Sequence, residues 1–252
     1  MKKHYLKNIF IISIGLFITS CVSPTKMIYL QNKGGLPLKE DLINFEPKIQ
    51  PGDLLTINVS ALDKEAVAPF NLYETTGFGI QKPISYLVNY DGTINFPALG
   101  TIKVKDLTNK QITTKIEHLL ADYIKNPIVN VRIINFKISV LGEVKNPGSY
   151  SVKSERISIF DAIAMAGDLT IVGKRGDVKL IREQNGIRKF VTLDLTDRRI
   201  VNSPYYYLAQ NDVIYVEPNK TKINTSANSP NTGIIISSIS TLISLIAIFV
   251  RI

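Results

Sequence analysis

Cys21 is the only cysteine in the 252-residue chain, and it stands where an apolar segment gives way to a polar one. The apolar segment, residues 9–18, is interrupted only by Ser13 and Gly15, and three lysines precede it. A positive start, a short apolar run and small residues after it form the pattern of a secretory signal peptide. The run is too short for a comfortable membrane span. We therefore predict that residues 1–20 are a signal peptide and exclude them from the fold.

The residues around the cysteine resemble the lipobox of bacterial lipoproteins. In Ile18-Thr19-Ser20-Cys21, small residues precede a thiol that would be acylated and become the new N-terminus. A lone thiol has no partner in its own chain in an oxidising compartment. The alternative is an ordinary signal peptide with a chance cysteine. We expect a diacylglycerol and an N-acyl chain such as palmitate at Cys21, and no other cofactor or metal.

The charge of the chain is modestly positive. It falls from +9 to +6 when three lysines leave with residues 1–20. An excess of this size suits an acidic polymer or anionic lipid head groups without requiring either. The basic residues are scattered, and nothing resembles a nucleic-acid-binding module. We therefore expect no nucleic-acid partner.

The C-terminal segment, "GIIISSISTLISLIAIFV" over residues 233–250, has no charged residue before Arg251. As a helix it would be roughly 27 Å long, close to the thickness of a bilayer core. A polar linker, residues 219–232, precedes it. We predict a transmembrane helix over 233–251.

The small and hydroxylated residues of this segment share one face. At about 100° per residue, five of them fall on a stripe that Ser238 does not join: Gly233, Ser237, Ser240, Thr241 and Ser244. Such a stripe allows close packing between membrane helices. Alternatively, it lines a wet lumen between several copies of the helix. The segment alone favours packing.

The middle of the chain reads as two α+β domains joined after a tether, residues 21–44. In the first domain, residues 45–134, a turn at Pro51-Gly52-Asp53 precedes a strand, and Asp91-Gly92 predicts a hairpin turn. One long helix is predicted over residues 107–127, beginning with a capping box at Thr108 and Gln111. Residues 128–144 return to strand.

The second domain, residues 136–218, repeats this pattern on a smaller scale. Ser158 is expected to cap a short helix that stops at Gly167, and Asn185-Gly186 predicts a hairpin. Several strands with a single crossing helix predict a small α+β unit of β-grasp type.

Five ordered blocks carry a family resemblance. "QPGDLLTINV", "YDGTINFPALGTIKVKDLT", "NPIVNV", "VLGEVKNPGSY" and "NDVIYVEP" resemble the polysaccharide export lipoproteins of the Wza type, in which an export domain precedes one or more β-grasp domains called SLBB. The chain departs from longer members in having one β-grasp unit. The resemblance implies a homo-oligomeric ring in the outer membrane, with its body in the periplasm, that exports capsular or extracellular polysaccharide. It also implies an inner-membrane polysaccharide co-polymerase as partner.

No pattern in the chain predicts an enzyme. The metalloprotease, serine-hydrolase and P-loop motifs are absent. Three aspartates sit beside turn residues, which favours turn formation over catalysis: Asp53, Asp91 and Asp212. His118 is expected to be a surface or packing residue on the long helix. Two basic pairs could contact an acidic polymer, but solvated loop charges are the favoured interpretation: Lys174-Arg175 and Arg198-Arg199. A run of three tyrosines, Tyr205-Tyr206-Tyr207, could stack on sugars, but core packing is favoured.

These features support a passive export channel without bond chemistry. One alternative is a periplasmic lipoprotein that binds glycan or another ligand and uses the C-terminal helix as a second anchor. Another is an inner-membrane scaffold with Arg251 at the cytoplasmic end of a tail anchor.

Overall fold

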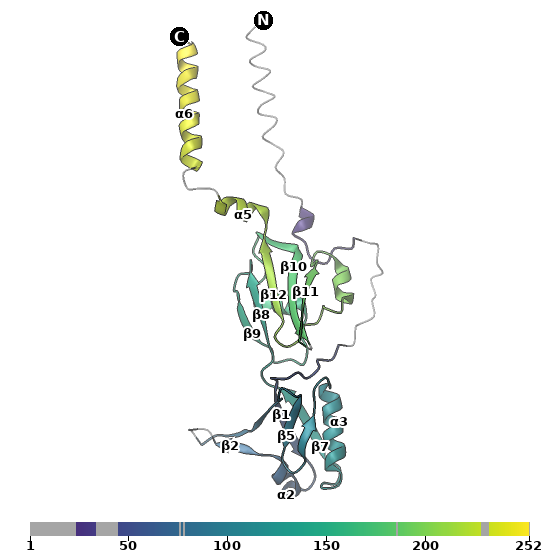
Figure 1. Ribbon diagram of the computed structural model, residues 1–252. Helices are drawn as coiled ribbons and strands as arrows, with labels where there is room; N and C mark the ends of the chain where they lie inside the picture. Colours follow the sequence, from purple (N-terminus) through teal and green to yellow (C-terminus); the bar gives the residue numbers. More distant parts are fainter. Residues whose placement is uncertain are drawn as a thin grey trace.

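The computed structural model describes residues 24–33, 45–75, 77, 79–184, 186–227 and 232–251. Figure 1 shows two bodies in line, with α5 (Lys220–Ala227) and α6 (Thr232–Arg251) beyond the second of them. Cys21 lies outside the described residues, so its predicted lipidation stays a prediction.

The first body is built on β1 (Leu54–Ser60), the central strand of a three-stranded sheet. It pairs antiparallel with β4 (Ser85–Leu87) on one side and β7 (Ile128–Ile133) on the other. Alternate residues of β1 are buried, as its alternating sequence predicts. Two further hairpins complete this body: β2 (Tyr73–Thr75) with β3 (Gln81–Pro83), and β5 (Thr93–Phe96) with β6 (Gly100–Lys103). The β2 hairpin projects away from the rest (Figure 1).

The turn at Asp91-Gly92 forms as predicted, but the strands around it do not form a ladder. Gly92 adopts a φ of 81° and its N–H donates to the carbonyl of Asn89 at 2.8 Å. The strand before the turn, β4, pairs with β1, whereas the strand after it, β5, pairs with β6. The predicted hairpin is therefore a corner between two sheets.

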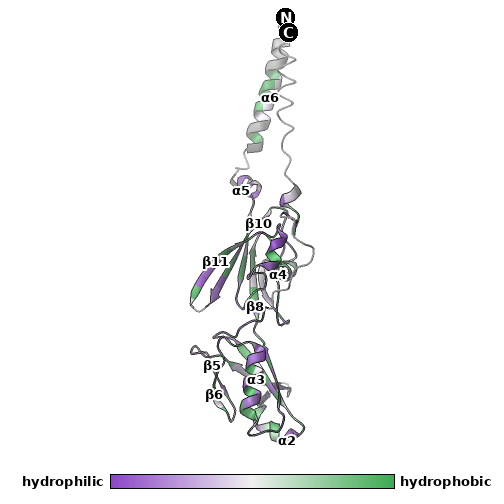
Figure 2. Ribbon diagram, turned by 90° about the vertical axis from the view of Figure 1, so that its right-hand side faces the viewer, coloured by the Kyte–Doolittle hydropathy of each residue, from purple (hydrophilic) through white to green (hydrophobic). Residues whose placement is uncertain are grey.

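Helix α3 (Asn109–Leu120) packs along the sheet of the first body. The predicted capping box is confirmed: Thr108 accepts from the backbone of Gln111, whose side chain accepts from the N–H of Thr108. Ile112, Ile116 and Leu120 are fully buried, and Figure 2 shows the alternation of apolar and polar positions along α3. The prediction of a long helix is wrong in its C-terminal part. The helix ends at Leu120, before Pro127, because the following turn directs Ile124 into the same core.

Two short helices, α2 (Lys64–Val67) and the 3₁₀ helix η2 (Ala68–Phe70), close the far end of the first body. Asp63 caps α2 by accepting from the N–H groups of Glu65 and Ala66. Asn71 then holds β1 from the side, since its side chain both accepts from and donates to the backbone of Val59.

The second body contains a five-stranded mixed sheet in the order β11-β10-β12-β8-β9. Its strands are β8 (Lys137–Gly142), β9 (Gly148–Ser151), β10 (Gly173–Gln184), β11 (Ile187–Leu193) and β12 (Val213–Pro218). Only the β12–β8 pair is parallel. Gly142 has a φ of 88°, and a Cβ there would lie 2.1 Å from the carbonyl oxygen of Val216, so the close approach of β8 to β12 requires glycine.

Helix α4 (Ile159–Met165) covers one face of this sheet. Ser158 and Asp161 form a capping box, and Gly167, with a φ of 77°, follows the last turn, which confirms both predicted ends. The β10–β11 hairpin is confirmed by the pairing of Gln184 with Ile187. The 3₁₀ helices η1 (Pro24–Lys26) and η3 (Arg198–Asn202) lie outside the sheet. The α+β architecture with a single crossing helix is as predicted.

Residues 134–136 join the two bodies, where one continuous strand was predicted over 128–144. The side chain of Asn135 accepts from the N–H of Leu54 at 2.9 Å and donates to the carbonyl of Gly52 at 3.0 Å. Its own carbonyl accepts from the side chain of Gln210 in the second body at 2.8 Å. Ile133 packs against both cores. The strand breaks here because its two halves pair in different sheets.

The C-terminal segment forms the 20-residue helix α6. Among the residues that the structure describes, no helix is long and apolar enough to cross a membrane. The predicted transmembrane helix over 233–251 is corrected accordingly: the helix is there, but a membrane span is not found. Five of the nine residues from Ser237 to Leu245 carry hydroxyl groups, so this part of α6 mixes polar and apolar side chains.

Candidate functional site

Residues 24–33 of the tether lie on the second body outside its sheet. We call these residues, together with the surface that they contact, the tether clasp. The tether runs alongside the segment after β11, where Gln31 forms an isolated parallel bridge with Asp197. The N–H of Leu30 donates to the carbonyl of Leu195 at 3.1 Å, and that of Gln31 donates to the carbonyl of Thr196 at 2.7 Å. The carbonyl of Gln31 in turn accepts from the N–H of Arg198 at 3.1 Å. Part of the predicted tether is thus held on the domain.

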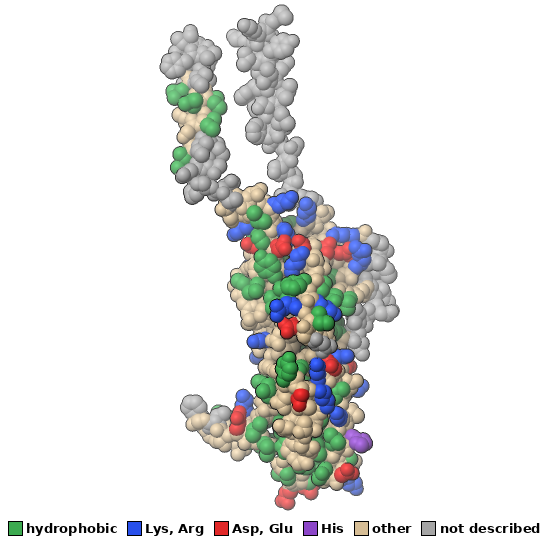
Figure 3. All heavy atoms as spheres, viewed as in Figure 1, with side chains coloured by type: hydrophobic (Ala, Val, Ile, Leu, Met, Phe, Trp, Pro, Cys, Tyr) green, Lys and Arg blue, Asp and Glu red, His purple; other side chains and the backbone are tan. Residues whose placement is uncertain are grey.

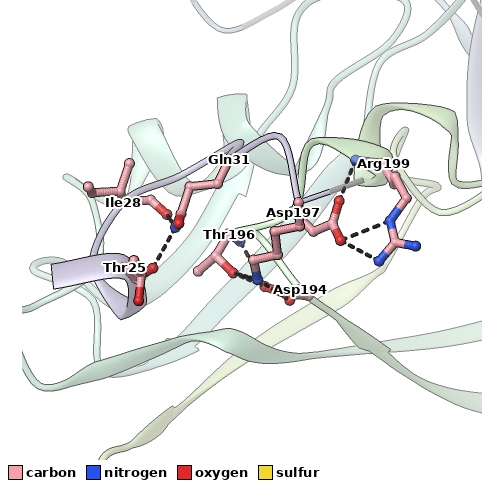
Figure 4. Close-up of polar contacts among 8 residues, drawn as sticks. Thr25, Ile28, Gln31, Asp194, Thr196, Asp197 and Arg199 are labelled. Carbon is pink, nitrogen blue, oxygen red and sulfur yellow. Dashed lines mark hydrogen bonds and ion pairs between the residues drawn. The ribbon is translucent and has the colours of Figure 1, made fainter. Parts of the chain in front are cut away.

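Side chains stabilise the shape of the clasp (Figure 4). Gln31 donates from its side chain to the carbonyl oxygens of Thr25 and Ile28, at 2.5 and 2.7 Å, which folds the tether back on itself. Lys33 reaches Asp194 at 3.1 Å and the hydroxyl of Thr196 at 2.5 Å. The tether therefore enters the domain in a defined conformation.

The electrostatics of the clasp favour ionised carboxylates. Burial opposes the charge of Asp194, but hydrogen bonds from Thr196 and the cation of Lys33 together hold its pKa below the usual range. The guanidinium and backbone N–H of Arg199 both bond Asp197 and lower the pKa of that carboxyl as well. Both groups carry a full negative charge at neutral pH.

Tyr29 is the anchor of the clasp. Its hydroxyl donates to Asp168 at 2.6 Å, and its ring meets the ring of Phe160 edge-on at 5.9 Å. The guanidinium of Arg175 lies over the same ring, 5.3 Å from its centroid. Burial and then the hydrogen bond to Asp168 raise the pKa of Tyr29, while the positive charge of Arg175 opposes the rise. The phenol therefore stays neutral and acts as a donor.

Beside the clasp, α5 follows β12 directly and its first residues share a cavity with the tether. Thr25, Lys26 and Met27 line one side of this cavity, and Lys220 and Thr221 line another. The chain entering after Cys21 and the chain leaving toward α6 thus meet at one end of the second body (Figure 1).

The predicted stripe residues all lie on α6: Gly233, Ser237, Ser240, Thr241 and Ser244. Three of their hydroxyls donate to carbonyls of the helix itself, from Ser237 to Ile234, from Thr241 to Ser237 and from Ser244 to Ser240, each at 2.9 Å. The off-stripe Ser238 does the same at 2.7 Å. These hydroxyls have partners without a second helix, so the stripe's role in packing or in a lumen stays a prediction.

Several apolar side chains of α6 are exposed in the single chain. Ile234, Ile239, Leu242, Ile243 and Leu245 are each at least half exposed. A row of large apolar side chains in water is unfavourable, by about 25 cal/mol for each Å². The described part of the chain leaves these side chains uncovered.

The aspartates predicted at turns do form turns, and two of them are also buried. Asp91 is on the surface, where bonds from Thr93 lower the pKa of its carboxyl. Asp53 is 1 % exposed; it accepts from the N–H of Gln50 at 2.8 Å, and burial raises its pKa to about 6. Asp212 is fully buried against Arg182, and its pKa is raised because burial outweighs the effect of that cation.

The tyrosine run packs within the protein, as the sequence favoured. Tyr207 stacks on Phe45 at 5.5 Å and lies under the guanidinium of Arg156. Arg182 lies over the ring of Tyr205 at 5.4 Å, and Tyr206 contacts Phe160. The described residues contain no group of three or more metal-ligating side chains.

One functional candidate was misjudged from the sequence. Lys174-Arg175 was interpreted as a pair of solvated loop charges, but both residues belong to β10 and Arg175 is only 7 % exposed. The sequence pattern gives little indication that Arg175 is buried, because a bulge between Gly173 and Val178 changes which side of the strand faces inward.

Comparisons with known proteins agree with this two-domain architecture. Residues 44–134 match the family model described as polysaccharide biosynthesis/export protein, and residues 137–188 match the SLBB domain. The EPS I polysaccharide export outer membrane protein EpsA of Ralstonia solanacearum is 28 % identical over 181 residues, 68 % of this chain and 48 % of that protein. EpsA of Ralstonia nicotianae is 30 % identical over 145 residues, 54 % of this chain and 38 % of that protein.

The export match precedes the SLBB match along the chain, in the order that the family resemblance predicted. The two matched domains and the similarity to EpsA support the predicted resemblance to the polysaccharide export proteins of the Wza type. The match spans less than half the length of each of these curated relatives.

Proposed function

We propose that this chain is a lipid-anchored subunit of an outer-membrane channel through which capsular or extracellular polysaccharide leaves the cell. The observation that carries the proposal is the order of the two matched domains, export domain and then SLBB domain, in a chain related to two proteins named as polysaccharide export outer membrane proteins. The protein would supply a conduit for the polymer and no bond chemistry.

The clasp supports the proposed anchor. Cys21 precedes Pro24 by three residues, which span at most about 10 Å, and the clasp fixes residues 24–33 on the second body. Acyl chains at Cys21 contribute roughly 0.8 kcal/mol for each buried methylene. They would hold the end of the SLBB domain that bears α5 against the periplasmic leaflet. The export domain would then point into the periplasm, toward an inner-membrane co-polymerase.

The exposed apolar side chains of α6 support assembly of several copies. Each helix would cover the apolar face of its neighbour, and the hydroxyl stripe would form the close contact or face the lumen. Because the hydroxyls already bond within the helix, neighbouring helices would lose no hydrogen bonds when they pack. A ring of copies, rather than one subunit, would enclose the polymer.

Three variants of the full chain test this function in cells that depend on it for export. Cys21→Ala is expected to abolish metabolic labelling with a palmitate analogue and to release the protein from outer-membrane fractions. Deletion of residues 232–251 is expected to leave the two domains folded but to abolish both the ring in electron micrographs and surface polysaccharide. Ser240→Leu on the stripe is expected to impair ring assembly.

The matched control is Ser238→Leu, which changes the same residue type off the stripe. Export that survives loss of residues 232–251, with protein that stays monomeric in detergent, would contradict the channel. Tight binding of a defined saccharide by such a monomer would favour the alternative, a periplasmic glycan-binding scaffold.

A further inference from the structure

A cavity of about 570 Å³ lies beside the clasp, where the tether, β10 and the start of α5 meet. The proposed function does not use this cavity. Five basic and two acidic side chains line it: Lys26, Lys33, Lys174, Arg175 and Lys220, with Asp177 and Asp194. Figure 3 shows basic and acidic side chains gathered at this end of the second body, next to α5. The cavity is therefore positively charged.

Arg175 is the unusual member of this set. Its side chain is almost completely buried, yet it forms no ion pair among the described residues. Its Nη1 donates weakly to the carbonyls of Gly173 at 3.3 Å and Thr170 at 3.4 Å and to the Sδ of Met27 at 3.9 Å, and its guanidinium lies over the ring of Tyr29. Its Nε has no hydrogen-bond partner within the described part of the chain. A buried guanidinium with an unpaired donor is costly, because charge and donor have both lost their water.

Two further cations of the cavity are also without an acidic partner. Lys33 is paired with Asp194, and Lys174 is paired with Glu217 at 2.7 Å. Lys26 and Lys220, by contrast, are exposed and form no ion pair with any described residue. Three positive charges from three different elements thus face one cavity without an acidic partner among the described residues.

The N-terminus of α5 adds donors to the same cavity. Asn219 caps this helix by accepting from the N–H of Lys222 at 3.0 Å, whereas Lys220 and Thr221, the first two helical residues, line the cavity. The first N–H groups of a helix have no partner within it, and they carry the positive end of the helix dipole. Such a terminus together with an unpaired arginine favours an oxyanion with several acceptor oxygens.

We infer that this cavity binds a phosphate ester, with Arg175 as the buried ligand and Lys26, Lys220 and the α5 terminus completing the site. The source of the phosphate rests on the proposed anchor. If Cys21 is acylated, the cavity lies next to the bilayer surface, and the head group of an anionic phospholipid is the phosphate within reach. Binding would then orient the SLBB domain on the membrane, which acyl chains alone do not.

The experiment measures phosphate binding by the full-length Cys21→Ala variant in a neutral, phosphate-free detergent. Titrations with inorganic phosphate and with glycerol 1-phosphate are followed by calorimetry, so binding does not depend on lipidation or export. The wild-type cavity is expected to bind glycerol 1-phosphate, and Arg175→Gln is expected to weaken binding at least tenfold. Arg188→Gln, which removes an exposed arginine of β11, is the charge-matched control and is expected to have no effect.

Arg175→Gln could also disturb the fold, so a second variant changes only exposed side chains. The double variant Lys26→Gln, Lys220→Gln is expected to unfold at the same temperature as its parent and to weaken binding several-fold. Absence of phosphate binding by the parent would overturn the site. An affinity of both cavity variants equal to that of the parent would overturn it as well.

Nanodiscs distinguish the two sources of phosphate. Preferential binding of the acylated chain to phosphatidylglycerol discs over discs of neutral lipid, lost in the double variant, supports the head group. Binding of free phosphate without any such preference supports a soluble phosphate ester instead. If the protein binds phosphate but does not support export of polysaccharide, the result counts against the proposed function and not against the phosphate site.

Discussion

The buried pair of Arg182 and Asp212 shows how a single residue can serve several elements. Arg182 on β10 donates from Nε and Nη2 to the carboxylate of Asp212, at 3.0 and 2.6 Å, and from Nη2 to the carbonyl of Tyr207 at 2.9 Å. Asp212 also accepts from the N–H of Ala209. One ion pair therefore holds β10, the tyrosine run and the start of β12 together.

Arg182→Ala is expected to destabilise the protein by about 3–5 kcal/mol, because it leaves the fully buried Asp212 without its cation. Arg188→Ala breaks the exposed pair with Glu183 in the same hairpin and is expected to change stability by less than about 0.5 kcal/mol. Urea unfolding of both variants measures the difference. Equal losses would show that burial of the pair has no special effect.

Asp53 makes stability depend on pH. Its folded pKa of about 6 lies above the value near 4 of an exposed aspartate, so the folded chain keeps a proton that the unfolded chain has released. This contribution to stability is fully present below about pH 4. It is lost as the pH rises through about 6.

Asp53→Asn keeps an acceptor for the N–H of Gln50 but removes the charge. The stability of the variant minus that of the wild type is expected to increase between about pH 4 and 6, by up to about 3 kcal/mol, and then to stay level. Unfolding curves at several pH values measure it, with the exposed Asp122→Asn as the control for loss of one charge. A difference that falls with rising pH would contradict the expected sign.

At the scale of elements, the clasp turns a tether into part of the second body. The backbone bonds described between the tether and the domain involve Leu30 and Gln31, and Leu30 adopts a φ of 53° there. Side-chain anchoring by Tyr29 compensates for this unfavourable conformation. The strength of the clasp therefore depends on a few bonds that single substitutions can remove.

Gln31→Pro is expected to open the clasp. Proline removes the N–H that donates to Thr196 and disfavours the backbone conformation of the preceding Leu30. Amide exchange at Leu30 and Arg198 should speed up about tenfold for a loss of about 1.4 kcal/mol. Gln31→Ala, which loses only the side-chain bonds, should show a smaller change; equal exchange in both variants would mean that the backbone bonds do not hold the clasp.

At the scale of the whole molecule, Asn135 fixes the relation between the two domains. Its side chain bonds to the export domain and its carbonyl to Gln210 of the SLBB domain. Ile133 packs into both cores at the same point. Phe45, at the start of the first domain, also stacks on Tyr207 of the second at 5.5 Å, so Asn135 acts together with neighbouring contacts at this junction.

Asn135→Ala is expected to loosen that junction. With Cys21→Ser as background, cysteines at the exposed positions Tyr90 and Ile187 carry spin labels for a distance measurement between the domains. The distance distribution should be narrow in the parent and broad in Asn135→Ala. Asn135→Asp retains the acceptor for Leu54, so the width of its distance distribution should be intermediate. A narrow distribution in Asn135→Ala would show that the side chain of Asn135 does not hold the two domains in place.

Local chemistry made much of this fold predictable from the sequence. The capping boxes at Thr108 and Ser158, the turns at Gly92 and Gly186 and the alternation along β1 depend on neighbours a few residues away, which the sequence displays. The ordered blocks were enough to indicate the family. The hydroxyl stripe was correctly predicted to lie on a helix for the same reason. The sequence did not decide which surface the stripe contacts.

Contacts between distant segments were decided only by the tertiary structure. The break at residues 134–136 exists because the two halves of a predicted strand pair in different sheets, and the tether becomes ordered because Thr196 and Asp168 happen to lie beside it. Arg175 is buried because a bulge reverses the phase of β10, and no periodicity in the sequence records that reversal. The sequence by itself determined most of the elements and their local caps and turns. Packing and long-range pairing decided where the long helix ends, where the strand over 128–144 breaks and which charges are buried together.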